Sequence, residues 1–293
     1  MLICAVIDGQ PSLLPEQPEP VLPWWSFTKT VLAATALILV RDGRLDLDGP
    51  VAGHDYTLRQ LLRHEAGLAD YAELAEYHVA VAHHEPAWPA QEMLQRLQAD
   101  RLRYNPGAGW RYSNVGYLMV ARLIERTTGQ PLADAVHARV LLPLGIINVR
   151  FATDRADLQH ACTGPATYDP GWVYHGLLIG PLSQAVLLLD RLFSEHLLPA
   201  DLLQAMQETH TLGGPIAGRP WQAPGYALGL MRGPVDGGVV LAGHTGCGPG
   251  SVVAVYRGCA GDVSASCAAF AKGVGEGDVE ACVVEHICRH LNG

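Results

Sequence analysis

The chain has 293 residues, of which 49% are hydrophobic and 17% are charged. This balance excludes an intrinsically disordered chain, and the length is sufficient for one large domain or for a domain with two lobes. The formal net charge is −9 and no run of Lys or Arg occurs, which excludes the basic stripe that a nucleic-acid-binding surface needs.

The N-terminal residues predict a strand followed by a turn. We also expect no membrane-spanning segment in the chain. Residues 1–10 contain a short apolar stretch that Asp8 ends, with no basic segment before it, so we interpret them as a first strand and not as a signal peptide. The longest apolar run, residues 31–40, is about half of the roughly 20 residues that a membrane-spanning helix needs.

The cysteine pattern favours free thiols. The seven cysteines are odd in number and form no C-x-x-C pair, which is typical of a reducing compartment, and we expect a cytoplasmic protein. They are Cys4, Cys162, Cys247, Cys259, Cys267, Cys282 and Cys288.

The chain up to about residue 221 is mostly helical in pattern after the first strand. A proline-rich loop, residues 11–23, precedes a deeply buried helix that Asp42-Gly43 ends. Thr57 is an expected N-cap, and residues 129–131 (Gly-Gln-Pro) stop another helix. The predicted helices are residues 26–41, 58–64, 114–128, 183–193 and 199–208.

The C-terminal part changes to strands separated by glycine-rich turns. The predicted strands are residues 226–231, 239–242, 251–256 and 263–270, followed by a helix over 278–291. Because one strand at the start must pair with several at the end, we expect an α/β (α+β) fold. Its antiparallel sheet is built from both chain ends and flanked by helices. We expect a single domain, with a sheet lobe (about 1–56 and 222–293) and an inserted, mostly helical lobe (about 57–221).

Lys29 is unusual because the chain uses arginine almost everywhere else. Of the 20 basic residues only Lys29 and Lys272 are lysines. A buried lysine can lose its proton and arginine cannot, so a lysine in this helix indicates a proton-transfer role. Ser26 lies three residues earlier, on the same helix face and near the helix N-terminus. A neutral amine beside a hydroxyl activates a serine nucleophile; the alternative is an N-cap serine with an unrelated lysine.

Two further motifs add polar groups. In Tyr112-Ser113-Asn114 the first and third side chains of an extended turn would face one cavity, and the phenol would relay a proton if a cation lowered its pKa. The alternative is a turn with Asn114 as an N-cap. His244-Thr245-Gly246 follows a predicted strand and would offer hydrogen bonds to a substrate carboxylate or carbonyl, or form a hairpin bounded by glycines.

The order S-x-x-K, Y-x-N, H-T-G resembles the serine β-lactamase family in its broad sense. That family includes class C β-lactamases, D-Ala-D-Ala carboxypeptidases or penicillin-binding proteins, D-aminopeptidases and β-lactamase-like esterases. The resemblance continues in residues 42–48 (D-G-R-L-D-L-D), 57–68 (T-L-R-Q-L-L-R-H-E-A-G-L), 106–117 and 226–230 (Y-A-L-G-L). It implies a β-lactamase/penicillin-binding-protein-like fold and a serine hydrolase that needs no cofactor or metal.

The resemblance also implies a role for each catalytic residue. Ser26 would be the nucleophile, Lys29 its base, and Tyr112 the general acid/base for the leaving group and water. The implied reaction is cleavage of an amide, peptide or β-lactam bond, in a small molecule or short peptide, through an acyl-enzyme. A carboxylesterase on the same scaffold and a non-catalytic binding protein are the alternatives.

Substrate-binding roles follow from the same resemblance. Asn114 would hold the substrate amide, His244-Thr245-Gly246 stands where many members have K-T-G, and the N–H groups of Ser26 and Cys247 would form the oxyanion hole. Trp25 replaces a small residue and would narrow the pocket, and Glu65-Ala66 replaces T-S as a structural change.

Two other features bear on partners and metals. The N-terminus lacks the family's leading helix and one strand, which predicts a smaller sheet and makes a homo-oligomer an alternative to a monomer. His78, His83, His84 and Glu85 resemble a metal-ligand cluster, but no matching partners occur elsewhere and we interpret them as a solvated loop.

Overall fold

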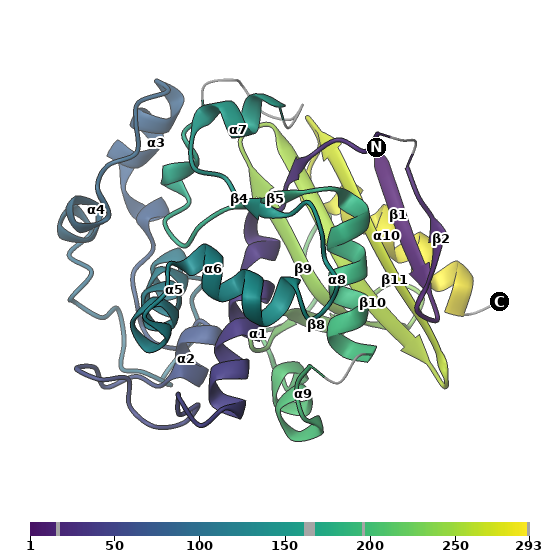
Figure 1. Cartoon of the computed structure of the whole chain (residues 1–293), viewed down its shortest axis with the longest axis horizontal. Coiled ribbons are helices and arrows are strands. Elements are labelled where there is room, and N and C mark those ends of the chain that lie inside the picture. The colour runs from purple at the N-terminus through teal and green to yellow at the C-terminus, as the bar shows by residue number, and fades with distance from the viewer. Residues whose placement is uncertain (16–17, 161–167, 195–196, 292–293) are drawn as a thin grey trace.

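The computed structural model describes residues 1–15, 18–160, 168–194 and 197–291. Its centre is an antiparallel sheet with the strand order β2-β1-β11-β10-β9-β8-β7-β6. Figure 1 shows the N-terminal strand β1 beside the late strand β11, which confirms the sheet predicted from both chain ends. The strands are β1 (Leu2–Ile7), β2 (Gln10–Leu13), β6 (His210–Thr211), β7 (Gly225–Tyr226), β8 (Met231–Pro234), β9 (Val240–Gly248), β10 (Ser251–Ala260) and β11 (Val263–Lys272).

Helices cover both faces of this sheet, and successive side chains along a strand point alternately to the two faces. Helix α10 (Glu276–Leu291) packs on β10 and β11 on one face, and α8 (Leu182–Ser194) packs on the other face (Figure 1). In β10, Val253 and Val255 belong to the main core with α8, whereas Val252 and Ala254 belong to the cluster under α10. Because both faces are buried, the period-two alternation is hidden in a continuous apolar run.

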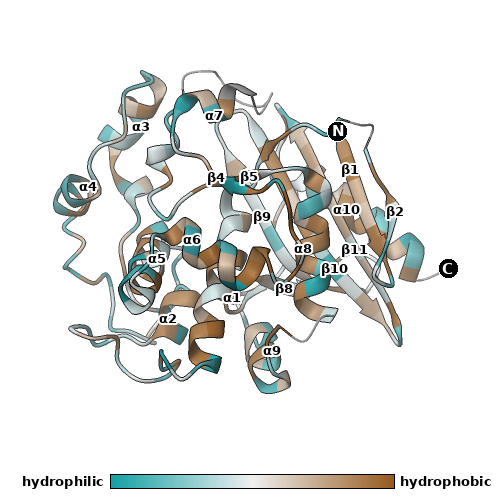
Figure 2. Cartoon of the chain, in the orientation of Figure 1, coloured by the Kyte–Doolittle hydropathy of each residue, from teal (hydrophilic) through white to brown (hydrophobic). Residues whose placement is uncertain are grey.

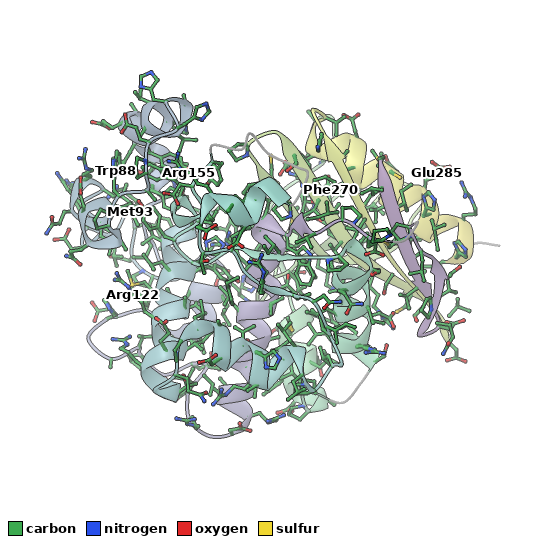
Figure 3. All side chains as sticks on the ribbon, turned by 45° about the horizontal axis from the view of Figure 1, so that its top comes forward. Trp88, Met93, Arg122, Arg155, Phe270 and Glu285 are labelled. Carbon is green, nitrogen blue, oxygen red and sulfur yellow. The ribbon has the colours of Figure 1, made fainter. Side chains whose placement is uncertain are left out.

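The helical region packs beside the sheet. Figure 3 shows Trp88 and Met93 of this region far from Phe270 of the sheet. Its helices are α2 (Leu58–Leu62), α3 (Ala75–Ala82), α4 (Ala90–Arg96), α5 (Asn114–Thr128), α6 (Leu132–Val136), α7 (Arg155–His160) and α9 (Ala200–Gln207), with 3-10 turns Tyr71–Glu73 and Pro170–Trp172 and a π-helical turn His137–Leu141. A small second sheet joins β3 (Leu22–Pro23), β5 (Leu178–Gly180) and β4 (Arg150–Phe151).

Helix α1 (Thr28–Arg41) passes through the middle of the molecule (Figure 1). Residues 28–39 are all buried, and Figure 2 shows hydrophobic residues along this helix and along the central strands. The predicted helix 26–41 is correct from residue 28, because residues 25–27 form a 3-10 turn. In the described part of the chain no helix is both long and apolar enough to cross a membrane.

Three local predictions are wrong, and two of the alternatives are not observed. The proline-rich loop contains β2 and β3, because Pro11 and Pro23 lie at positions where a strand tolerates a missing N–H donor. The predicted strand 226–231 is split by a turn at residues 227–230, where Gly229 has φ +75°. The predicted strand 239–242 is too short, because β9 continues to Gly248. His244-Thr245-Gly246 therefore lies within a strand, and the alternative of a hairpin is not observed. The alternative of Asn114 as an N-cap is not observed either, because Ser113 caps α5.

Other local expectations agree with the structure. Thr57 caps α2 and forms a capping box with Gln60. The cysteines that the structure describes are free thiols; Cys162 lies outside the described residues.

Candidate active site

Ser26 lies in the 3-10 turn between β3 and α1, close against strand β9. The turn starts with a strained backbone, since Trp25 has φ +41°, a conformation that non-glycine residues rarely adopt. Gly246 of β9 allows the close approach: a Cβ atom at this position would lie 2.6 Å from the Ser26 nitrogen. The strand therefore brings the Ser26 N–H and the backbone around Cys247 together.

Lys29 is fully buried one helical turn behind Ser26 and has three polar neighbours. Its Nζ lies 3.0 Å from Ser26 Oγ, 2.7 Å from Asn114 Oδ1 and 3.2 Å from His175 Nε2. Burial lowers the pKa of Lys29 from 10.5 to about 7, and the charge of Asp70 opposes this shift. A neutral amine can donate two N–H bonds, to Asn114 and His175, and keep its lone pair for the Ser26 hydroxyl proton.

Tyr112 approaches Ser26 from the opposite side. Its hydroxyl donates to Ser26 Oγ at 3.0 Å, so Ser26 Oγ is the meeting point of the amine and the phenol. The condition of a cation that lowers the Tyr112 pKa is not met: burial raises this pKa above its usual value of 10, and the Ser26 hydrogen bond only partly opposes the rise. The phenol therefore keeps its proton at neutral pH and is a donor.

Asn114 is fixed at the first turn of α5. Its backbone N–H donates to the carboxylate of Asp70, which also accepts from Ala72 N–H at 2.8 Å. Ser113 Oγ caps the helix by accepting from Gly116 N–H at 3.1 Å. This capped start holds the Asn114 side chain against Lys29.

The polar atoms of His244 and Thr245 are engaged within the protein. His244 Nδ1–H donates to the Thr245 carbonyl at 2.6 Å, and its Nε2 accepts from Tyr226 Oη at 2.9 Å. Thr245 Oγ1 lies 2.7 Å from Tyr256 Oη and also bonds to Glu280. Burial lowers the pKa of His244 to about 3, so its ring is neutral.

One cavity of about 630 Å³ collects most of the residues predicted for the site. Lys29 lies behind it, and Gly246 lies in β9 against the Ser26 turn. Of the two tryptophans, Trp25 lines the cavity while Trp24 is buried in the core. The predicted residues on its wall are Trp25, Ser26, Tyr112, Asn114, His244, Thr245 and Cys247.

Sequence reasoning missed three residues on the same cavity wall. His175 contacts Lys29, is 1% exposed, and has no partner for Nδ1 among the described residues. Its signal was a lone histidine in the apolar segment 173–179. Arg219 and Glu276 also line the cavity, but neither has a sequence signal, because each is an ordinary charged residue until the fold brings them together.

The histidine-rich segment lies away from this site. His78 is on α3 and His83, His84 and Glu85 follow it, all exposed. Glu65 Oε1 lies 3.0 Å from His210 Nδ1, and we interpret this contact as structural. The described residues include no group of three or more His, Cys, Asp or Glu side chains placed to hold a metal ion.

Comparisons with known proteins give a family and a fold for this chain. The family model described as Beta-lactamase matches residues 1–259. The structure is similar to a D-stereospecific amidohydrolase from Streptomyces sp. (25% identity, TM-score 0.73, covering 91% of this chain and 88% of that one). It shares the fold of the D-amino acid amidase from Ochrobactrum anthropi SV3 (22% identity, TM-score 0.78, covering 99% and 94%).

Curated relatives match over shorter stretches. Penicillin-binding protein 4* of Bacillus subtilis is 30% identical over 45% of this chain and 32% of its own length. Esterase EstB of Burkholderia gladioli is 32% identical over 44% of this chain and 38% of its own length. The matched stretch thus spans about a third of the length of each of these longer proteins.

Proposed function

The chain belongs to the Beta-lactamase family, and on this premise we propose that it is a serine hydrolase that cleaves an amide or ester bond through an acyl-enzyme on Ser26. The observation that carries the proposal is the position of Ser26 Oγ, 3.0 Å from Lys29 Nζ and 3.0 Å from Tyr112 Oη. The similarity to an amidohydrolase and to an esterase supports both bond types.

In the proposed acylation step, Ser26 Oγ attacks the substrate carbonyl carbon while its proton passes to the Lys29 lone pair. The N–H groups of Ser26 and Cys247 stabilise the oxyanion, and each such donor contributes about 3 kcal/mol. Tyr112 donates its proton to the leaving nitrogen or oxygen as the carbonyl–heteroatom bond breaks, and the proton held by Lys29 restores the phenol. In the second step water takes the place of the leaving group and the transfers run in reverse.

The proposal also covers the organisation of the chain. We propose a single catalytic domain over 1–293, with the sheet lobe at about 1–56 and 222–293 and the helical lobe at about 57–221. The main core supports it, because residues of both lobes share that core. Self-association into a homo-oligomer is part of the proposal; a penicillin-binding protein homologue from Pyrococcus abyssi with this fold is described as octameric (19% identity, TM-score 0.74).

A labelling experiment tests the proposal. The protein is incubated with a fluorophosphonate and with a labelled penicillin, and intact and peptide mass spectrometry look for an adduct on Ser26. We expect an adduct with at least one reagent and none on the Ser26→Ala variant. Absence of an adduct with both reagents would favour the non-catalytic alternative. Hydrolysis of p-nitrophenyl butyrate, nitrocefin and D-Ala-D-Ala then separates the esterase, β-lactamase and peptidase alternatives.

A further inference from the structure

Two charged residues, Arg219 and Glu276, line the cavity in front of Ser26. The buried Glu280 pairs with Arg219 from behind, and we name these three residues the charged wall. Arg219 donates from Nε to Glu280 Oε2 at 2.7 Å and from Nη2 to Glu280 Oε1, and its Nη1 donates to Glu276 Oε2 at 2.8 Å. Two carboxylates thus face one guanidinium, so the charged wall has a net charge of −1. Among the described residues that line the cavity, only Arg219 and Glu276 are charged.

No other group on the described wall offers a free positive charge to a substrate carboxylate. His244 is neutral and both of its ring nitrogens are bonded within the protein. Burial, and the charge of Lys29, lower the pKa of His175 well below its usual value, so this ring is neutral as well. Lys29 itself lies behind Ser26 and loses its proton near pH 7. A carboxylate entering this cavity would therefore lose its hydration without gaining an ion pair.

The rest of the wall suits an organic cation. The faces of aromatic rings attract ammonium groups, and the attraction grows as water is excluded. The Glu276 carboxylate is close enough to influence the catalytic groups: it is one of the smaller causes, behind burial, that raise the pKa values of Tyr112 and Cys247. Seven aromatic residues line the cavity: Trp25, Tyr71, Tyr77, Trp110, Tyr112, Tyr168 and Tyr226.

We propose that this cavity selects amide or ester substrates that carry a protonated amine, and disfavours substrates that carry a carboxylate, with Glu276 setting the preference. The inference rests on the proposed hydrolase function and narrows its substrate class. It also assigns the H-T-G segment a structural role in β9, in place of carboxylate binding.

Three p-nitrophenyl esters with the same leaving group and acyl chains of similar length test the proposal: the esters of 6-aminohexanoic acid, heptanoic acid and pimelic acid (as the monoester). Measured at about pH 8, where the amine and the free carboxyl are both ionised, kcat/KM should fall in the order ammonium, methyl, carboxylate. Glu276 is 37% exposed, so solvent weakens its field and we expect a ratio of about tenfold or more between the first and last esters.

The Glu276→Gln variant removes the charge and keeps the shape. We expect it to bring the three kcat/KM values within about threefold of one another. The main changes should be a higher kcat/KM for the carboxylate ester and a lower kcat/KM for the ammonium ester. Glu285→Gln is the matched control, because Glu285 lies on the same helix but is exposed and pairs with Arg289 (Figure 3). A flat series in the wild-type protein, or an order that Glu276→Gln leaves unchanged, would overturn the proposal.

A binding measurement separates this inference from the proposed function. At about pH 6, below the α-amine pKa of roughly 7.7, Ser26→Ala is titrated by calorimetry with phenylalanine amide, N-acetylphenylalanine amide and N-acetylphenylalanine. These ligands share one side chain and then carry charges of about +1, 0 and −1. If phenylalanine amide binds more tightly than the other two ligands, and Ser26→Ala/Glu276→Gln loses this difference, the charge preference is supported even if no ester is hydrolysed. Hydrolysis of the neutral ester together with equal or reversed binding of the three ligands would refute the charge preference and leave the hydrolase function standing.

Discussion

At the scale of the residue, the proposed chemistry depends on the protonation of Lys29. A charged ammonium would have three N–H donors for its three neighbours but no lone pair for the Ser26 proton. Burial provides the lone pair by lowering the Lys29 pKa to about 7, and no arginine could be deprotonated in this way. This accounts physically for a lysine here in a chain that otherwise uses arginine almost throughout.

The pH dependence of the reaction should report this group. Because the neutral amine is the base and its pKa is lowered to about 7, kcat/KM for the heptanoate ester should rise with pH, by about tenfold per unit below this value, and level off above it. Burial raises the pKa of Tyr112, so the plateau should extend into the alkaline range. Tyr112→Phe should lower the plateau by about 10²–10⁴ and leave the acid limb in place. A profile that is flat between about pH 5 and 9 would contradict the assignment of Lys29.

His175 is predicted to position the amine. In His175→Leu one Lys29 N–H loses its acceptor, so we expect a plateau about 10- to 100-fold lower. The acid limb should also move to lower pH, because a charged ammonium suffers more from the lost acceptor. His175→Gln offers an oxygen at similar reach and should restore most of the rate. Tyr174→Phe removes a hydrogen bond to the Trp88 carbonyl from the same loop and is the control. Equal losses in the Leu and Gln variants, with no shift of the limb, would indicate a purely structural role.

At the scale of the element, local signals predicted the helices well and the strands less well. Helix α5 was predicted with its observed bounds because Gly129 and Pro131 stop it, although its N-cap proved to be Ser113. Strand β9 was predicted too short, because Gly243, Gly246 and Gly248 weaken a strand pattern. These glycines are explained only by the fold, since β9 must pass against the turn that holds Ser26.

Gly246 gives a direct test of that packing. Gly246→Ala would place a Cβ atom 2.6 Å from the Ser26 nitrogen and 2.8 Å from the Trp24 carbonyl oxygen, so backbone must move. A displacement of about 1 Å at the nucleophile should lower kcat/KM about 100-fold or more. The control is Gly275→Ala, whose Cβ would meet only Asp278 at 3.7 Å. Both variants should be compared by esterase kinetics and circular dichroism; a folded Gly246→Ala protein with wild-type kinetics would show that the close approach is not needed.

At the scale of the whole molecule, the site could be predicted only in part. Ser26 and Lys29 are neighbours along one helix, so their spacing predicts their contact. Tyr112 could be added because its motif has a known order in related proteins. His175, Arg219 and Glu276 reach the cavity from three separate parts of the fold, and no local pattern joins them. The charge preference of the cavity is therefore a property of the tertiary structure and not of any motif.

The shared core predicts that the two lobes unfold together. Leu61 of the helical lobe and Phe270 of the sheet lobe belong to the same main core. Truncating either to alanine should lower the free energy of unfolding by about 2–5 kcal/mol. Because α1 lies between the lobes and contacts elements of the helical lobe as well as the Ser26 turn, each substitution should destabilise both. Hydrogen exchange with mass spectrometry, following peptides from residues 57–160 and 222–291, should show the same loss of protection in the two lobes for each variant. If Leu61→Ala loosened only the helical peptides, the single-domain proposal would be wrong and the lobes would be separate cooperative units.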